Sequence, residues 1–291
     1  MPQANSDAQL PPRHGVVEPS GAPAGSTPVC APSRCDDPSA AGGAASQLLP
    51  QAAGFAITSD LASVDGSPSR MASSSTSNAS QLRITEIFYS LQGETSRIGL
   101  PTVFIRLTGC PLRCTYCDTA YAFTGGQNMS LANILQRVAE YAPHYVTVTG
   151  GEPLAQKNCL PLLRDLCDAG YEVSLETGGA LDVSEVDTRV MRVVDIKTPA
   201  SGEVAKNRWE NLALLTQHDE IKFVLCDEND YQWAKQILQQ HHLTEKCAVL
   251  FSPAHGTLNV TQLADWILRD HLPVRLQVQL HKLLWNNVPG H

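Results

Sequence analysis

Residues 109–119 have the sequence GCPLRCTYCDT and place three cysteines, Cys110, Cys114 and Cys117, in one short segment. The apolar run at residues 102–107 (TVFIRL) leads directly into this segment and predicts a strand that ends in a cysteine loop. Glycine and proline interrupt the loop, so no regular helix or strand holds its thiols apart. Thiolates grouped in this way bind soft metal centres. The segment therefore predicts a metal centre at the end of a strand.

The number of thiols in this loop indicates which metal centre to expect. A structural zinc site normally has four ligands, and the nearest histidine in the sequence is His144. Three cysteines around a four-iron cluster would leave one iron open to an exogenous ligand. We therefore expect an iron–sulfur cluster, with a structural zinc site or a chance grouping of thiols as the alternatives.

The charge balance and composition exclude several classes of protein. Lysine and arginine number 21 against 29 aspartates and glutamates, a formal net charge of −8, whereas binding nucleic acid needs clustered basic residues. No apolar run approaches the roughly 18 residues that span a bilayer, and no basic-then-apolar signal pattern opens the chain. Nine cysteines, an odd number, suit a reducing compartment. We expect a cytoplasmic protein with neither a membrane nor a nucleic-acid partner.

The first 81 residues differ in composition from the rest of the chain. They are rich in Ala, Ser, Gly and Pro, and they contain no lysine and one aromatic residue, Phe55. Such a segment buries too little apolar surface to offset the entropy of ordering it. We expect disorder over residues 1–81 and one domain over residues 82–291. Met71 is an alternative start, which would make the preceding stretch a mis-assigned extension.

Strand and helix patterns alternate from residue 82 onward. This alternation predicts βαβ units in an α/β fold with a parallel sheet, and about six or seven such units favour a partial or full barrel over a flat sheet. In such barrels the chemistry collects at the carboxyl ends of the strands. The carboxyl ends of expected strands are where the cysteine loop, Gly150–Pro153, Thr177–Gly179 and Asp195–Thr198 lie. The expected strands are residues 82–89, 102–107, 145–149, 171–176, 190–196, 220–225, 248–251 and 274–280, and the expected helices are residues 131–139, 160–169, 208–215, 230–241 and 260–270.

Four further features each have an ordinary and a functional interpretation. Asp118-Thr119 is either a turn with a local side-chain hydrogen bond or, through the Thr119 hydroxyl, part of an Mg²⁺ site. Residues 91–94 (LQGE) are either a hairpin turn or a polar loop that presents amides to a heterocycle. Arg106 is either a surface side chain or a buried one that needs a carboxylate. Residues 281–286 either lie on the surface or cover one end of the barrel.

Tyr116, just before the last cysteine, and Gly150-Gly151-Glu152-Pro153, after the next strand, add to the pattern of the cysteine loop. Together with the C-x3-C-x2-C spacing, they resemble the radical S-adenosylmethionine (SAM) enzymes. The glycines let a ligand approach the backbone closely. We expect exposed turn carbonyls and Glu152 to accept hydrogen bonds from the SAM ammonium, with an ordinary strand-to-loop turn as the alternative.

More narrowly, the chain from residue 82 onward resembles the 7-carboxy-7-deazaguanine synthase family of radical SAM enzymes. The LQGE turn and the C-D-T after the last cysteine are specific to this family within the superfamily. The resemblance implies a truncated parallel β/α barrel, a homodimer and Mg²⁺ dependence. The implied reaction converts 6-carboxy-5,6,7,8-tetrahydropterin to 7-carboxy-7-deazaguanine with loss of ammonia, for queuosine and deazapurine biosynthesis, with a flavodoxin or ferredoxin as electron donor. The matching segments are residues 88–94 (FYSLQGE), 106–111 (RLTGCP), 116–119 (YCDT), 148–153 (VTGGEP), 176–179 (ETGG) and 279–282 (QLHK).

The resemblance also implies roles for individual residues. It makes Cys110, Cys114 and Cys117 the ligands of a [4Fe–4S] cluster and Thr119 a ligand of Mg²⁺, and it assigns no catalytic side chain, since the cluster and SAM generate the radical. Gly178 departs from the serine that many relatives carry after Glu-Thr, so a hydroxyl contact to SAM cannot be carried over there. SAM would be bound by Tyr116, Cys117, Asp118, Gly151, Asp195, Ile196 and Lys197, and the pterin by Leu91, Gln92, Gly93, Arg106 and Thr149.

Two rival functions use the same cysteine loop. A radical SAM activase that makes a glycyl radical on a partner protein would share it, but gives no reason for the LQGE turn or the C-D-T. A zinc-dependent binding module would account for the thiols without any radical chemistry.

Overall fold

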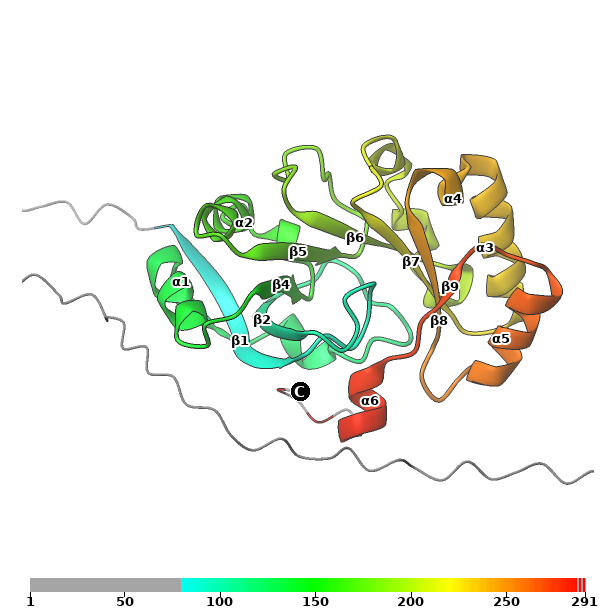
Figure 1. The fold of residues 1–291 in the computed structure, drawn as a ribbon, viewed down its shortest axis with the longest axis horizontal. Coiled ribbons are helices and arrows are strands. Elements are labelled where there is room, and N and C mark those ends of the chain that lie inside the picture. Colours follow the sequence, from blue (N-terminus) through cyan, green and yellow to red (C-terminus); the bar gives the residue numbers. More distant parts are fainter. Residues whose placement is uncertain (1–79, 287, 289, 291) are drawn as a thin grey trace, which may run out of the picture. The chain divides into compact units, whose positions relative to one another are not determined.

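The computed structural model describes residues 80–286, 288 and 290 (Figure 1). The predicted disorder over residues 1–81 and the alternative start at Met71 therefore lie outside the described residues, apart from residues 80 and 81. The first strand begins at Gln81, one residue before the predicted domain boundary. In the part of the chain that the structure describes, no helix combines the length and apolar character needed to cross a membrane.

A nine-stranded sheet forms the framework, in the order β3-β1-β2-β4-β5-β6-β7-β8-β9. From β2 to β9 neighbouring strands run parallel, which confirms the predicted partial parallel β/α barrel. β1 pairs antiparallel with β2 and β3, an arrangement that the sequence did not predict. The strands are β1 Gln81–Leu91, β2 Pro101–Leu107, β3 Gln127–Ser130, β4 Tyr145–Gly150, β5 Glu172–Thr177, β6 Met191–Ile196, β7 Glu220–Leu225, β8 Ala248–Pro253 and β9 Arg275–Leu276.

Six α-helices accompany the described strands. The Ser130 hydroxyl accepts the N–H of Asn133 at 3.2 Å and so caps α1, as the sequence predicted. The predicted helix at residues 208–215 is instead a short 3-10 helix, Trp209–Ala213. In Figure 1, α1 and α2 flank the green strands and α3 to α5 flank the orange end, while α6 stands apart from them. The helices are α1 Leu131–Ala139, α2 Cys159–Asp168, α3 Glu228–His241, α4 Leu243–Lys246, α5 Val260–Arg269 and α6 Leu280–Trp285.

The predicted last strand, residues 274–280, is wrong in length. Only Arg275–Leu276 pairs with β8, and the chain then leaves the sheet and enters α6. The N–H of Gln277 still bonds to the Phe251 carbonyl at 2.9 Å, but the N–H of Leu280 bonds to the Gly93 carbonyl at 2.9 Å. The Leu280 N–H thus bonds to a distant loop rather than to the strand ladder, and the strand ends early.

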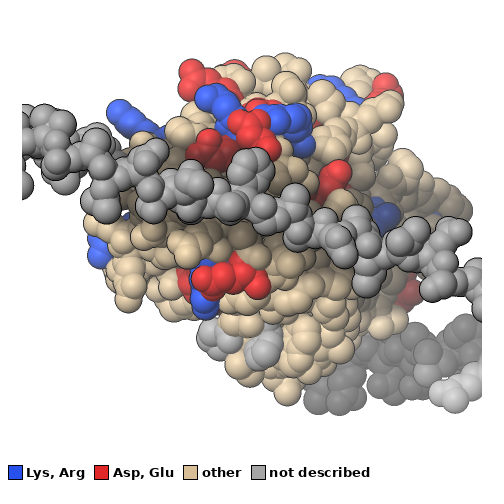
Figure 2. Space-filling model, turned by 60° about the vertical axis from the view of Figure 1, so that its left-hand side comes forward, with Lys and Arg blue, Asp and Glu red and all other residues tan. Residues whose placement is uncertain are grey.

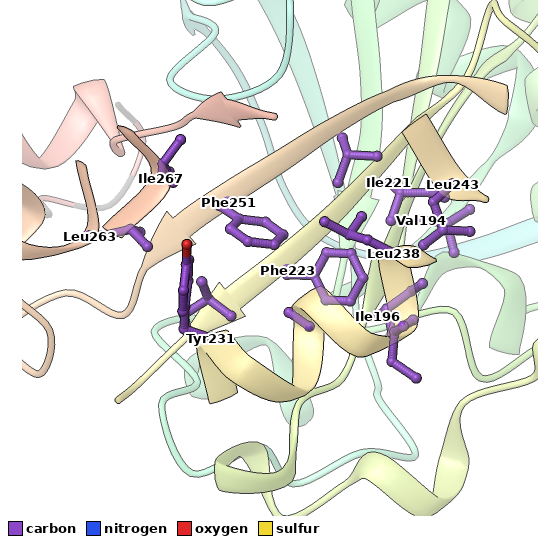
Figure 3. Close-up of a cluster of buried hydrophobic side chains, with 14 of the residues drawn as sticks. Val194, Ile196, Ile221, Phe223, Tyr231, Leu238, Leu243, Phe251, Leu263 and Ile267 are labelled. Carbon is purple, nitrogen blue, oxygen red and sulfur yellow. The ribbon is translucent and has the colours of Figure 1, made fainter. Parts of the chain in front are cut away.

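An apolar core between β6–β8 and helices α3 to α5 fixes which side chains face inward. Figure 3 shows Phe223 beside Phe251, with ring centroids 5.5 Å apart, and Tyr231 packs edge-on against Phe251 at 6.0 Å. Each such side chain contributes about 1.5–3 kcal/mol when fully buried. Since successive strand residues face opposite sides, burial of Phe223 in this core turns its neighbours Lys222 and Val224 toward the cavity on the other face.

Acidic and basic side chains share the surface. On the face shown in Figure 2, lysines and arginines lie next to aspartates and glutamates, with wide uncharged areas between them. Surface ion pairs include Arg189 with Asp187 and Arg208 with Asp182. Exposed pairs of this kind contribute little to stability, so the fold depends on its apolar cores.

Candidate active site

A cavity of about 440 Å³ opens at the carboxyl ends of the parallel strands. This volume lies in the range of small-molecule sites, roughly 300–1,000 Å³. The side chains of Arg106, Thr149, Glu176 and Asp195 reach it from β2, β4, β5 and β6 in turn. Fourteen of the fifteen predicted site residues line this cavity, namely Leu91, Gln92, Gly93, Arg106, Cys110, Cys114, Tyr116, Cys117, Asp118, Thr119, Thr149, Gly151, Asp195 and Lys197.

Ile196 is the fifteenth residue to which the family resemblance gives a role, and its side chain does not line the cavity. It is 3% exposed and belongs to the core between β6 and the helices. Strand alternation explains this placement, because Asp195 next to it faces the cavity. Lys197 Nζ bonds to Asp195 Oδ2 at 2.8 Å, so the two flanking residues form an ion pair in the cavity wall.

The three cysteines of the loop are free thiols and line one cavity. Burial raises the pKa of the Cys110 and Cys114 thiols above their usual value, so a positive centre would be needed to hold them as thiolates. Within the described residues, no three His, Cys, Asp or Glu side chains converge on a point for a single metal ion. Three thiols on one loop are the donor set of a four-iron cluster with one open iron.

Two sets of contacts hold the cysteine loop in place, a close approach at Gly151 and hydrogen bonds from Thr115. A Cβ at Gly151 would lie 2.3 Å from the Gly109 carbonyl oxygen and 2.8 Å from Cys110 Cβ, so only glycine fits beneath the loop. The Thr115 hydroxyl donates to the Ala200 carbonyl at 2.8 Å, and the Thr115 N–H donates to the Ser201 carbonyl at 3.0 Å. The loop is therefore clamped between the end of β4 and the turn after β6.

Glu152 does not meet the expectation that its carboxylate accepts hydrogen bonds from SAM. It is fully buried and does not line the cavity. Its oxygens accept the Gly178 N–H at 2.7 Å, the Leu154 N–H at 3.1 Å and the Thr177 hydroxyl at 2.9 Å. Burial raises the pKa of Glu152 even though these hydrogen bonds oppose the shift. Glu152 thus ties the end of β5 to the turn after β4.

Gly178, where the sequence departs from the family pattern, lies in a crowded position. A Cβ there would lie 2.9 Å from Leu112 Cδ1 and 3.2 Å from Glu152 Oε2. A serine could fit only if Leu112, a side chain of the cysteine loop, moved. The glycine therefore matches the local packing of this chain.

A second group of cavity residues is polar and linked by hydrogen bonds. Gln92 is 2% exposed and donates to Thr147 Oγ1 at 3.2 Å and to Glu176 Oε1 at 3.4 Å. The Thr149 hydroxyl donates to Glu176 Oε2 at 3.0 Å. Burial raises the pKa of Glu176, with Lys222 opposing the shift and Glu94 adding to it. The functional interpretation of the LQGE turn as a polar loop is consistent with this group.

Arg106 has the carboxylate partner expected of a buried arginine. Its Nε donates to Glu86 Oε1 at 2.7 Å, and the Tyr121 hydroxyl donates to the same oxygen at 2.8 Å. The guanidinium also lies 5.8 Å from the ring centroids of Phe88 and Tyr121. Glu86 and the two rings therefore hold the Arg106 guanidinium in place, and the Arg106 side chain also lines the cavity.

Two buried polar atoms in the cavity wall lack a partner within the described chain, the Tyr116 hydroxyl and Asp195 Oδ1. Buried polar groups in folded proteins are nearly always hydrogen-bonded. These atoms, beside the three thiols, fit the side chains expected around a polar cosubstrate such as SAM.

Several cavity residues were missed from the sequence. Lys222 Nζ lies 2.8 Å from Glu94 Oε2 in the cavity wall. Burial opposes the charge on Lys222, but Glu94, Asp195 and Glu176 outweigh it, and the pKa of Lys222 lies above its usual value. A lysine within the apolar run of β7 was the available signal.

Gln279, His281 and Lys282, just before and within α6, also line the cavity. Of the two interpretations of residues 281–286, covering one end of the barrel therefore fits better than a surface position. A Cβ at Gly93 would lie 2.3 Å from His281 Nδ1, so the LQGE turn and residue 281 are in close contact. Lys282 is 7% exposed and pairs with Asp118 at 2.6 Å. Burial opposes the charge on Asp118, but Lys282 outweighs it and holds the pKa of that carboxyl well below its usual range.

Comparison with known proteins gives the class first. The radical SAM superfamily profile matches residues 104–194, which contain the cysteine loop and the strands that follow it. QueE from Escherichia coli has a similar fold, with a TM-score of 0.58 and 24% identity over 69% of this chain and 95% of that chain. The fold and the three-thiol loop thus define a radical SAM protein, whose family uses a [4Fe–4S] cluster and SAM.

The family within that class follows from closer relatives. The 7-carboxy-7-deazaguanine synthase of Chlorobaculum tepidum is 46% identical over 213 residues, 72% of this chain and 97% of the relative. The protein of the same name from Koribacter versatilis is 45% identical over 70% of this chain and 97% of the relative. The chain belongs to the 7-carboxy-7-deazaguanine synthase family. Membership of this family favours the synthase over the glycyl-radical activase and the zinc-binding module.

Proposed function

We propose that the chain is a radical SAM lyase that converts 6-carboxy-5,6,7,8-tetrahydropterin to 7-carboxy-7-deazaguanine and releases ammonia. The names of its relatives support the reaction. The observation that carries the proposal is that one cavity is lined both by the three thiols and by the buried polar side chains of Gln92, Thr149 and Glu176. A cluster-bound cosubstrate and a polar heterocycle would meet there.

Cys110, Cys114 and Cys117 would hold the cluster. When bound, the cluster and SAM supply the 5′-deoxyadenosyl radical that removes a hydrogen from C6 of the pterin. Tyr116 and Asp195 line the cavity and each has a buried oxygen without a partner in the described chain, so we propose that both contact SAM. The other groups proposed to contact SAM are Cys117, Asp118, Gly151, Lys197 and the backbone of Ile196.

The pterin would be held by the polar side chains of the cavity and by Arg106. Gln92 and Thr149 are already oriented by Glu176, so little side-chain ordering is left for binding. Arg106 is a fixed cation suited to the 6-carboxylate, since arginine binds carboxylates in a planar, bidentate manner. Leu91 and Gly93, on either side of Gln92, complete the proposed substrate contacts.

Mg²⁺ would bind at Thr119. Mg²⁺ usually takes few protein ligands and several oxygens from water or substrate. Thr119 lines the cavity and its hydroxyl is already fixed by Asp118 Oδ1 at 2.9 Å. A single protein oxygen beside a carboxylate substrate fits this coordination preference.

Three further properties belong to the same proposal. The reduced state of the cluster calls for an electron donor of flavodoxin or ferredoxin type, and the family resemblance supports a homodimer. We assign the protein to the cytoplasm, where free thiols such as the seven described here are kept reduced.

Product analysis tests the proposed function. Anaerobically reconstituted protein is incubated with SAM, Mg²⁺, dithionite and 6-carboxytetrahydropterin, and the products are identified by mass spectrometry. We expect 7-carboxy-7-deazaguanine, ammonia and 5′-deoxyadenosine. Formation of 5′-deoxyadenosine with no deazapurine would point to another radical SAM reaction and refute the substrate assignment.

A further inference from the structure

Residues 279–282, which we call the clasp, join two separate loops of the cavity. Gln279 Nε2 donates to Glu94 Oε1 at 3.0 Å and to Asp118 Oδ2 at 3.2 Å, so one amide spans the LQGE turn and the cysteine loop. The Leu280 N–H donates to the Gly93 carbonyl at 2.9 Å. These contacts link residues far apart in the sequence, and the clasp closes the cavity between them.

The charged contact of the clasp is a lysine removed from water. The Lys282 side chain is 5% exposed, and its Nζ donates to Asp118 Oδ2 at 2.6 Å. A buried ammonium without a counter-charge is strongly disfavoured, so Asp118 is the group that permits Lys282 to lie there. In turn Lys282 and Gln279 occupy one carboxylate oxygen of Asp118 and fix its orientation.

The other oxygen of Asp118 reaches the adjacent residue. The Thr119 hydroxyl donates to Asp118 Oδ1 at 2.9 Å. A hydroxyl that has committed its hydrogen keeps two lone pairs directed elsewhere, and these are what a cation needs. Gln279 and Lys282 hold one oxygen of Asp118, so the other oxygen is fixed in position and orients the Thr119 hydroxyl.

We propose that Lys282 is a positioning residue for a divalent cation at Thr119: it fixes Asp118, and Asp118 fixes the Thr119 hydroxyl. This inference rests on the proposed function, which supplies the Mg²⁺ and the pterin. Substituting a residue that orients a metal ligand typically lowers metal affinity or activity about 10- to 100-fold. The cation site is therefore complete only when the clasp is in place.

The test measures binding of Mn²⁺, an EPR-visible substitute for Mg²⁺. Oxidised holoenzyme is titrated with SAM and 6-carboxytetrahydropterin present and no reductant, so that no turnover occurs. Lys282→Met keeps an unbranched side chain one atom shorter and removes the charge, and we expect Mn²⁺ affinity to fall about 10- to 100-fold at unchanged iron content. Lys282→Arg restores the charge and should recover most of that affinity.

Lys235→Met is the matched control, because it also removes a lysine–aspartate pair, with Asp270, but between α3 and α5. It should leave Mn²⁺ affinity unchanged. Normal Mn²⁺ affinity in Lys282→Met, equal weakening in the control, or loss of iron in both Lys282 variants would each overturn the positioning role.

Product formation by the unsubstituted protein is scored separately. If that protein makes 7-carboxy-7-deazaguanine while Lys282→Met binds Mn²⁺ normally, the positioning role alone fails. If it makes no deazapurine while Lys282→Met binds Mn²⁺ more weakly, the positioning role stands and the proposed reaction fails. If it binds no Mn²⁺, the cation site at Thr119 and the positioning role of Lys282 both fail, whatever the product analysis shows.

Discussion

Two kinds of polar side chain surround the cavity, and their hydrogen bonds distinguish them. Glu152 is satisfied by protein donors and holds two loops together, whereas Asp195 Oδ1 and the Tyr116 hydroxyl are buried without a partner in the described chain. An unsatisfied buried polar group costs about 1–3 kcal/mol. Both unsatisfied atoms belong to residues that line the cavity, where a bound cosubstrate would supply the missing hydrogen bonds.

The cluster assignment gives the first prediction. Cys114→Ala should abolish iron binding and turnover, because two thiols cannot hold a four-iron cluster with one open iron. Iron content and visible absorption after anaerobic reconstitution measure this. Cys167→Ala, at a free cysteine outside the loop, is the control and should reconstitute normally. Retained activity in Cys114→Ala would contradict the ligand assignment.

The predictable part of the site consists of residues whose motif is local. The cysteine loop, Gly150-Gly151 and Asp195 lie at the carboxyl ends of strands that the sequence marks clearly, and the structure brings them to one cavity. Lys222 and Glu176 could not be assigned in this way. Their roles depend on which strand face turns inward and on partners such as Glu94, distant in sequence, and neither is fixed by local pattern.

Among the elements, β6 and β7 are joined at their start by a buried ion pair. Arg192 on β6 donates through Nε to Asp219 Oδ1 at 2.9 Å and through a terminal nitrogen to Oδ2 at 2.7 Å. The Thr216 N–H also donates to this carboxylate at 2.8 Å. Burial opposes the charge on Asp219, but these donors outweigh it and lower the pKa of the carboxyl.

Asp219→Asn should therefore destabilise the fold by about 3–5 kcal/mol, because it leaves Arg192 buried and unpaired. A carboxyl with a lowered folded-state pKa stabilises above its unfolded value, near 3.8, and loses that contribution as pH falls through the folded value. We expect the unsubstituted chain, and not the variant, to lose this part of its stability below about pH 4. Urea unfolding of the cluster-free chain, followed by circular dichroism, measures both effects. Equal stability at pH 7 would contradict the prediction.

The sequence predicted most elements but failed at the end of the chain. Residues 274–280 alternate like a strand, yet only two of them pair with β8. The six residues of α6 form too short a helix for periodicity to reveal, and α6 is held by contacts to Gly93 and Asp118. Tertiary contacts therefore override the local pattern at this point.

On the scale of the whole molecule, the partial barrel brings strand ends together so that one cavity receives side chains from β2, β4, β5, β6 and β7. Two apolar cores support the sheet, one against α1 and α2 and one against α3 to α5. The fold class was predictable because alternating strands and helices leave few arrangements. The antiparallel pairing of β1 with β2 and β3 was not predictable, because the composition of a strand does not determine the direction in which it pairs.

The proposed domain boundary is tested by truncation. A chain that starts at Met71 should bind iron and turn over like the full chain, because every cavity residue lies at position 88 or later. Iron content, thermal stability and product formation are compared for the two forms, and N-terminal peptide mass spectrometry of the native protein reports its start. Native peptides from residues 1–70 would refute the alternative start.

In the proposed reaction, a radical made at the three-thiol loop acts on a pterin held by the polar side chains of the same cavity. The most direct measurement of this step uses 6-carboxytetrahydropterin deuterated at C6, with SAM, Mg²⁺ and reductant under argon. We expect deuterium to appear in 5′-deoxyadenosine in step with formation of 7-carboxy-7-deazaguanine. Unlabelled 5′-deoxyadenosine, or none at all from a fully reconstituted cluster, would contradict the account.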